Sequence, residues 1–288
     1  QLADIDINNY NIDPKQIIAG ITKETKAILP VDLTGQPSPI DEINEIAEEN
    51  DIAVVEDCCH AFGAEYKGRR VGSLSDINTF SFHPVKHFTT GEGGVLLTNN
   101  EEIYNKALKF RTHGITKEVD QLTKNDGGWY YEMQELGQNY RLTDIQCALG
   151  ISQLSRVDEF IKRRIEIAKR YDDQLSRIDE VIIPFQEQYS KSSYHLYVIR
   201  FDLDKISCTR KDIYDALNKE NIGTQVHYIP LYRQPYYVNR YKYLASNFPN
   251  SEKYYETALS LPIFPYMTDN DVQDVIDAIS KIIKYYAK

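Results

Sequence analysis

Side chains suited to catalysis follow successive apolar segments between residues 57 and 94. Asp57 ends the run AVVED, His60 comes shortly after it, Ser81 ends INTFS, and Lys86 precedes the glycine-rich turn GEGG. An acid, an imidazole, a hydroxyl and an amine at strand ends suit proton transfer and nucleophilic chemistry, which a purely structural sheet does not need. Their succession predicts a chemical site.

Taken one at a time, the same residues have ordinary structural explanations. A lone lysine is most often a solvated surface residue. Asp57 fits a strand-end or helix-capping acid, and His60 and Ser81 fit polar residues of a core. The prediction of a site therefore depends on all four residues occurring in one segment.

The segments that must position these residues alternate between strand and helix patterns. Residues 25–35 are typical of a short strand followed by a turn, and AVVED, residues 53–57, is typical of a second strand. The segment between them predicts a helix whose apolar residues share one face, namely Ile43, Ile46 and Ala47. Such a unit makes a parallel sheet, which places ligands at the carboxyl ends of its strands, and Asp57 lies at such an end.

The rest of the first half predicts two strands and two helical regions. The strands cover 77–83 and 93–99, and a long helical pattern, with interruptions at most, runs from Thr143 to Leu175. A helix over 101–113 ends at Gly114 and has one apolar face, made of Ile103, Ala107 and Phe110.

The second half predicts a smaller α/β unit. Strand patterns cover 181–185, 194–202 and 224–230, and helices are expected after Thr209, Ser251 and Thr268. We therefore predict a large domain over residues 1–155 and a small C-terminal domain over residues 156–288.

Composition and charge exclude several classes of protein. Hydrophobic residues make up 42% of the 288 positions, which is enough for two ordinary cores. The net charge of −10 argues against a general nucleic-acid or membrane-surface binder, because such partners attract positive charge. No run of about 18 apolar residues and no signal-peptide pattern occurs, so we expect a cytoplasmic protein.

Four long segments of the chain resemble one known family. They are VVEDCCHAFGAEYKGRRVGSLSDINTFSFHPVKHFTTGEGGVLLTNN, YYEMQELGQNYRLTDIQCALGISQL, VHYIPLYRQPYY and LSLPIFPYMTDNDVQDVIDAI. All resemble the DegT/DnrJ/EryC1/StrS family of sugar aminotransferases that depend on pyridoxal 5'-phosphate (PLP). The resemblance implies the fold type I of PLP-dependent transferases, an α/β fold with a mostly parallel sheet in the large domain and a small C-terminal α/β domain.

The resemblance also implies roles for the four residues of the predicted site. Lys86 matches the lysine that forms a Schiff base with PLP and then transfers protons. Asp57 matches the acid that keeps the pyridine nitrogen protonated, so that the ring can accept electrons. His60 matches the position near the phenolic oxygen of PLP, and Ser81 matches the serine that contacts the phosphate.

Residues outside that segment receive roles from the same resemblance. Asn139 matches the asparagine that reaches the PLP phosphate of the neighbouring subunit, which implies a homodimer with shared active sites. Arg141 lies beside it and either serves an anion or supports the loop. His227 and Tyr228 match a segment near the nucleotide-sugar pocket, although a strand-end pair is the structural alternative. No metal site is expected.

The expected reaction moves an amino group, with glutamate as donor, to a UDP-linked 4-keto-6-deoxy sugar. The YYEMQ and PLYRQPYY segments look most like family members of pseudaminic acid synthesis. Alternatives are another nucleotide-sugar aminotransferase of the family, or a related regulator without turnover. A sugar dehydratase is disfavoured, because the known dehydratases have histidine where this chain has Lys86.

The chain is expected to begin inside the large domain of the family pattern. The first quarter of that pattern has no counterpart in the sequence, including a helix N-terminus that supplies N–H groups to the PLP phosphate. An aromatic residue against the PLP ring also has no counterpart. Two alternatives follow: a further N-terminal segment of a longer protein completes the site, or the product is incomplete and inactive.

Overall fold

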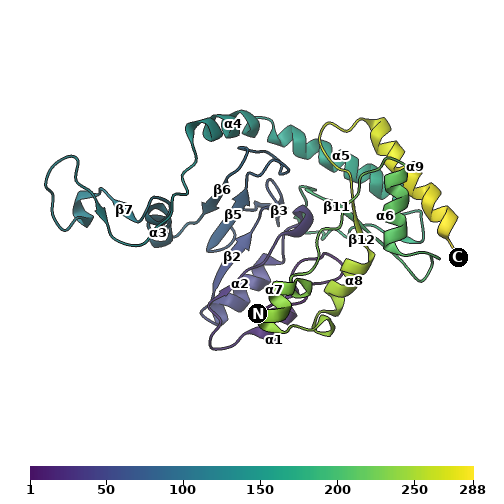
Figure 1. Ribbon diagram of the computed structural model, residues 1–288, viewed down its shortest axis with the longest axis horizontal. Coiled ribbons are helices and arrows are strands. Elements are labelled where there is room, and N and C mark those ends of the chain that lie inside the picture. The colour runs from purple at the N-terminus through teal and green to yellow at the C-terminus, as the bar shows by residue number, and fades with distance from the viewer.

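A computed structural model, which describes residues 1–288, contains a four-stranded sheet of the order β1-β2-β5-β6 (Figure 1). Its strands are β1 (Ala27–Ile28), β2 (Ala53–Asp57), β5 (Ile77–Ser81) and β6 (Gly94–Leu97). β1, β2 and β5 run parallel, whereas β6 pairs antiparallel with β5. The expected mostly parallel sheet is confirmed.

Helix α2 (Ile40–Glu49) packs against this sheet because its apolar residues recur every three or four positions. The three residues predicted to share its inner face are buried in one core with Ile28 and Val54, namely Ile43, Ile46 and Ala47. The short helix α1 (Pro14–Gly20) contributes Ile17 to the same core.

A second, smaller sheet joins distant parts of the chain. It has the order β10-β3-β4, and its strands are β3 (Glu65–Tyr66), β4 (Arg69–Arg70) and β10 (Ser190–Lys191). β10 belongs to the predicted small domain, yet it pairs with β3 of the predicted large domain. The domain boundary near residue 155 stays a prediction.

Residues 101–142 form an arm that extends away from the two larger sheets (Figure 1). The arm contains α3 (Glu101–Arg111) and a hairpin of β7 (Ile115–Thr116) and β8 (Glu132–Met133). The predicted helix over 101–113 is confirmed, but none of its residues is buried. The apolar face of α3 is therefore only partly covered within this chain, since Ile103 and Ala107 are half-buried and Phe110 is exposed.

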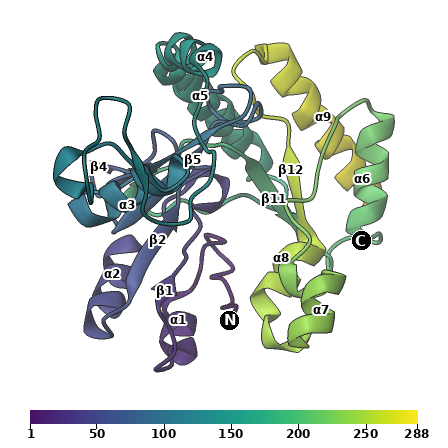
Figure 2. The same ribbon diagram turned by 60° about the vertical axis from the view of Figure 1, so that its left-hand side comes forward.

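The long helical pattern that follows the arm forms two helices. α4 (Asp144–Leu154) starts with Thr143 as its N-cap, and α5 (Val157–Leu175) follows after a break at Ser155 and Arg156. The first turns of α5 bury Val157 and Ile161 against Phe88, while its later turns join the core of the other large sheet. Figure 2 shows α4 and α5 above the two sheets.

The second large sheet is antiparallel and has the order β12-β11-β9. Its strands are β9 (Val181–Ile182), β11 (Tyr197–Phe201) and β12 (Ala258–Leu261), and every residue of β11 is buried. The strand predicted over 224–230 is wrong, because only Gln225 makes a bridge, to Ser260. The chain leaves the sheet there, and His227 and Tyr228 line a cavity instead.

Four further helices complete the second half of the chain. They are α6 (Arg210–Lys219), α7 (Pro235–Tyr241), α8 (Pro249–Thr257) and α9 (Asp269–Tyr286). Thr209 caps α6 as predicted, with its hydroxyl accepting the Asp212 N–H. None of the helices is both long enough and apolar enough to cross a membrane.

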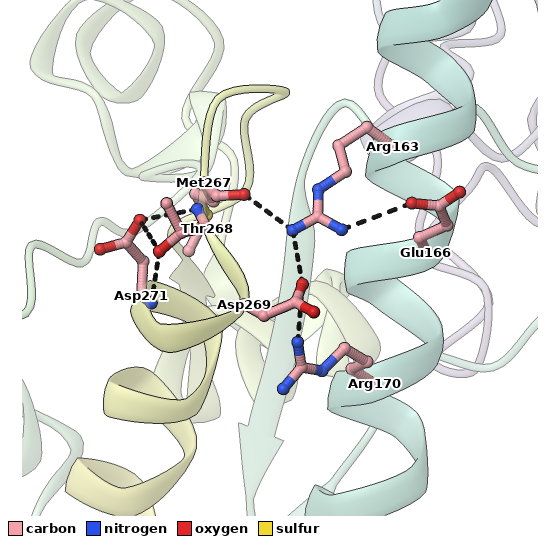
Figure 3. Close-up of polar contacts among 7 residues, drawn as sticks. All are labelled: Arg163, Glu166, Arg170, Met267, Thr268, Asp269 and Asp271. Atoms are coloured by element: carbon pink, nitrogen blue, oxygen red, sulfur yellow. Dashed lines mark hydrogen bonds and ion pairs between the residues drawn. The ribbon is translucent and has the colours of Figure 1, made fainter.

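The start of α9 is held on α5 by charged contacts (Figure 3). Arg163 donates to the Met267 carbonyl and to the Asp269 carboxylate, at 2.8 Å each, and Arg170 contacts the same carboxylate at 2.8 Å. Thr268 caps α9 and bonds to Asp271. These contacts tie the N-terminus of α9 to α5.

Two carboxyl groups are buried together beneath the end of the parallel sheet. Asp32 and Glu56 are both 0% exposed, and their oxygens lie within 4.8 Å of each other and of the Cys58 sulfur. Burial, together with the neighbouring carboxylate, raises the pKa of Asp32 well above its ordinary value, and burial raises that of Glu56. We infer that the pair retains a proton.

This pair predicts a falling stability as the pH rises. The folded state holds a proton that the unfolded chain releases above the ordinary aspartate pKa of 3.8, so unfolding becomes easier as pH increases through that range. The slope is about 1.4 kcal/mol per pH unit while the difference of one proton lasts. Asp32→Asn supplies a fixed N–H, so denaturant unfolding between pH 5 and pH 7 should then depend less on pH.

The matched control is Glu49→Gln, because Glu49 is exposed on the same segment of the chain. This variant should keep the pH dependence of the parent protein. An Asp32→Asn protein with an unchanged slope of unfolding free energy against pH would contradict the shared proton.

Candidate active site

Lys86 lies in the loop between β5 and β6, and backbone hydrogen bonds close this loop at its base. The Phe82 N–H donates to the Gly93 carbonyl at 2.9 Å, and the Phe82 carbonyl accepts the Thr90 N–H at 3.1 Å. The rings of Phe82 and Phe88, which flank Lys86 in the chain, pack with centroids 4.7 Å apart. The apolar anchors on both sides hold the lysine at the end of the sheet.

The Lys86 amine is partly withdrawn from water. Burial lowers its pKa below the ordinary value of 10.5, and the neighbouring Cys59 and Asp57 offset part of this effect. No side-chain hydrogen bond contributes to its pKa. A lysine in this state reaches the neutral, nucleophilic form more easily than a surface lysine.

Asp57 lies close to this amine because it ends β2, the strand that pairs with β5. One oxygen of its carboxylate accepts the Cys59 N–H at 3.0 Å. Burial, and then contact with Asp57, raises the pKa of the Cys59 thiol to about 12, so the thiol stays neutral. Because the thiol is neutral, the Asp57 carboxylate is the negative group next to Lys86 that can pair with a cation.

Three buried histidines pack against one another with tilted rings near the lysine. The His195 ring lies 4.3 Å from that of His60 and 5.4 Å from that of His87, measured between centroids. Burial lowers the pKa of His60 and of His87 to about 3, and it lowers that of His195 well below its ordinary value. All three rings are neutral at physiological pH, and the Nδ1 atom of each has no hydrogen-bond partner.

A cavity of about 620 Å³ opens beside Lys86. Its walls come from both halves of the chain and include Lys86, Arg164, His195, His227 and Tyr228. His227 is oriented by a 2.8 Å hydrogen bond between its Nδ1 atom and the Ser260 hydroxyl. The structure thus brings Lys86, His227 and Tyr228 to one cavity, although the sequence places them far apart.

Two of the predicted residues lie next to the cavity but do not line it. His60 packs against the His195 ring at a tilt, and its ring centroid lies 6.5 Å from that of Tyr228. Ser81 ends β5, and its hydroxyl accepts the His83 N–H at 3.3 Å. Since the Ser81 hydroxyl only accepts in this contact, its own proton is available to a bound group.

Asn139 and Arg141 are not brought to Lys86 within one chain. Both are exposed near the junction of the arm with α4. Asn139 forms a bridge with Thr112, and the Tyr140 N–H donates to the Arg111 carbonyl. Their predicted roles toward a neighbouring subunit stay predictions.

Sequence reasoning missed His87, His195 and Arg164. His87 and His195 appeared only as members of a loop and a strand. Arg164 appeared as one of two consecutive arginines on a helix. A signal was nevertheless present, because Arg164 occupies the apolar stripe of α5 between Ile161 and Ile167, where a charge is unexpected.

Comparison with protein families and curated proteins agrees with this arrangement. The model of the DegT/DnrJ/EryC1/StrS aminotransferase family matches residues 1–280. An uncharacterised protein of Methanocaldococcus jannaschii is 44% identical over 97% of this chain and 72% of its own length. A UDP-4-amino-4,6-dideoxy-N-acetyl-beta-L-altrosamine transaminase of Campylobacter jejuni is 37% identical over 99% of this chain and 74% of its own.

Solved structures share the fold over the whole chain. Helicobacter pylori PseC, an aminotransferase involved in pseudaminic acid biosynthesis, superposes with a TM-score of 0.91 at 30% identity, over 99% of this chain and 74% of its own. The Streptococcus pneumoniae protein Spr1654 in its PLP form gives 0.89 at 28% identity, over 99% and 75%. These similarities confirm the expected fold type I, and the chain belongs to the DegT/DnrJ/EryC1/StrS aminotransferase family.

Proposed function

We propose that this protein is a cytoplasmic, PLP-dependent transaminase that moves an amino group from glutamate to a UDP-linked 4-keto-6-deoxy sugar. The observation that carries the proposal is the half-buried Lys86 amine, which lies beside Asp57 and opens on a large cavity. The Campylobacter and Helicobacter relatives support a substrate of this sugar class and a role in a pathway of the pseudaminic acid type.

The donor set around Lys86 fits PLP. The amine has no protein partner to displace, the buried Nδ1 atom of His60 lacks a hydrogen-bond partner, and Ser81 has a hydroxyl proton to donate. Asp57 supplies the carboxylate that a protonated pyridine nitrogen requires. Bound PLP would supply an aldehyde for the substrate amine and a ring that accepts electrons.

The residues of this chain would then have distinct tasks. The Nζ atom of Lys86 holds the cofactor at rest and afterwards moves a proton. Asp57 keeps a proton on the ring nitrogen through its charge. Burial keeps the His60 ring neutral, so its N–H could donate to a phenolic oxygen without adding positive charge. The Ser81 hydroxyl could donate to a phosphate.

The cavity that Lys86 lines is large enough for part of a nucleotide-linked sugar. About 620 Å³ falls within the usual range of roughly 300–1,000 Å³ for small-molecule sites. His227 and Tyr228 line it and can bond to sugar hydroxyls or to a diphosphate, and the bond to Ser260 fixes the His227 ring. These contacts support the substrate class but do not select one sugar.

We further propose that two copies form a homodimer through the arm and α4. Large apolar residues are exposed along this region, including Trp129, Leu136, Ile145 and Ile151, of which Ile145 is 83% exposed. Exposed apolar surface of this extent marks a protein interface. Asn139 and Arg141 lie on the same region, where they can complete the site of the neighbouring subunit.

Lys86→Ala tests the proposed chemistry. The full-length protein mixed with PLP and reduced with borohydride should carry the cofactor on Lys86, as peptide mass spectrometry can establish. The variant should show no such adduct, and its amination of a UDP-4-keto sugar by glutamate should fall by at least about a thousandfold. Lys67→Ala, which changes an exposed lysine, is the control and should keep both properties.

Labelling at another lysine, or product formation that survives Lys86→Ala, would refute this assignment. A protein that binds PLP on Lys86 yet forms no product from any nucleotide keto-sugar would favour the regulator.

Mixed dimers test the shared site. Lys86→Ala and Asn139→Ala homodimers should each have low activity, and mixing the refolded subunits should restore up to about a quarter of the parent activity. Half of the random dimers are mixed, and each mixed dimer has one intact site of two. Ile145→Asp should reduce the mass measured by light scattering to that of one chain, whereas Tyr285→Asp, at an exposed position of α9, should not.

If mixing restores nothing while each homodimer remains dimeric, both residues act within one subunit and the shared site is wrong. A protein that is monomeric before any substitution would contradict the dimer itself.

A further inference from the structure

Arg164 is a buried cation whose charge no acidic side chain balances. It lies in the middle of α5 and is 5% exposed, in the apolar stripe that also contains Ile161 and Ile167. It takes part in none of the ion pairs of the chain, and burial alone lowers its pKa, to about 10. The guanidinium is therefore still charged at neutral pH, in a place where a charge is costly without a partner.

The hydrogen bonds of Arg164 leave part of its guanidinium free. Nη1 donates to three backbone carbonyls, those of Tyr194 at 3.2 Å, His195 at 3.1 Å and Ile263 at 2.8 Å. The Nε atom is fully buried and has no partner, and no protein acceptor bonds to Nη2. Carbonyl dipoles on one corner of the group hold it in place but do not neutralise it.

The neighbouring Arg163, on the same helix, has its charge neutralised by carboxylates. It is more exposed than Arg164, yet it contacts the carboxylates of Asp269 and Glu166 (Figure 3). Arg164 is the more deeply buried of the two, yet it contacts no carboxylate. Arg200 is also buried without a carboxylate, but of these two buried arginines only Arg164 lines the cavity, where a ligand can supply the missing negative charge.

The position of Arg164 says where that ligand sits. Arg164 and Lys86 line the same cavity. The charges of both residues also lower the pKa of His87 and of His195, so these two neutral rings lie near both cations. An anion at Arg164 would therefore lie in the cavity that Lys86 also lines.

We propose that Arg164 binds a carboxylate of the amino-acid donor and orients the donor toward the cofactor position at Lys86. This inference rests on the proposed transaminase function. A carboxylate accepts strong, charge-assisted hydrogen bonds from a guanidinium, and Nη2 of Arg164 has no protein acceptor to displace. The cofactor phosphate and the nucleotide diphosphate are the other anions of the reaction, and the experiment separates all three.

The experiment uses the full-length protein loaded with PLP and separates the two half-reactions. Arg164→Gln, and Arg164→Lys as a second variant that keeps the charge, are compared with the parent protein. The first half-reaction is followed by cofactor absorbance during titration with glutamate alone. The second is followed with the amine form of the cofactor and a UDP-4-keto sugar, and PLP affinity is measured by fluorescence.

The expected result is selective. Arg164→Gln should raise the glutamate concentration for half-maximal rate by roughly 10- to 100-fold, because a charged hydrogen-bond pair is lost. PLP affinity and the sugar half-reaction should stay within about twofold. Arg164→Lys should lie between the two proteins, since an ammonium keeps the charge but loses the planar pair of donors.

The matched control is Arg163→Gln, which should lower the melting temperature through its lost contacts but leave the glutamate response unchanged. The inference is overturned if Arg164→Gln weakens PLP binding or the sugar half-reaction instead, or changes only the melting temperature. If the parent protein transfers no amino group, the proposed function fails by itself. Glutamate binding that calorimetry detects in the parent protein and not in Arg164→Gln would still support the carboxylate site.

Discussion

The partial removal of one lysine amine from water is the constraint on which the site depends. Lys86 would be an ordinary solvated residue if its loop were free, and the loop is not free because Phe82 closes it by backbone bonds and packs on Phe88. Burial then lowers the pKa of the amine. Asp57 limits this effect, so that the lysine stays both reactive and compatible with its surroundings.

The second half of the chain supplies most of the cavity wall, whereas the loop of Lys86 supplies the rest. Helix α5 makes the connection, since its first turns pack on Phe88 and its later turns belong to the core of the antiparallel sheet. His195, His227 and Arg164 reach the cavity from that second half. The relative placement of the two sheets therefore sets the shape of the cavity.

Burying a charge costs free energy, and three kinds of buried ionisable group in this chain differ in how they avoid or offset that cost. The Asp32 and Glu56 carboxyls retain a proton, and the three buried histidines remain neutral. Arginine has neither option, because its guanidinium keeps its charge near neutral pH even when burial lowers its pKa. Arg164 must therefore find a negative partner, and within the chain it finds only carbonyl oxygens.

The sequence by itself determined the local elements and the family. The apolar periodicity of α2, the cap at Thr209 and the order of Asp57, Ser81 and Lys86 along the strands are local patterns, and local patterns survive without knowledge of the fold. Only the tertiary structure decided that the chain leaves the sheet after Gln225, that α3 buries none of its residues fully, and that Arg164 lines the cavity. Those outcomes depend on contacts between residues far apart in sequence, which no single segment encodes.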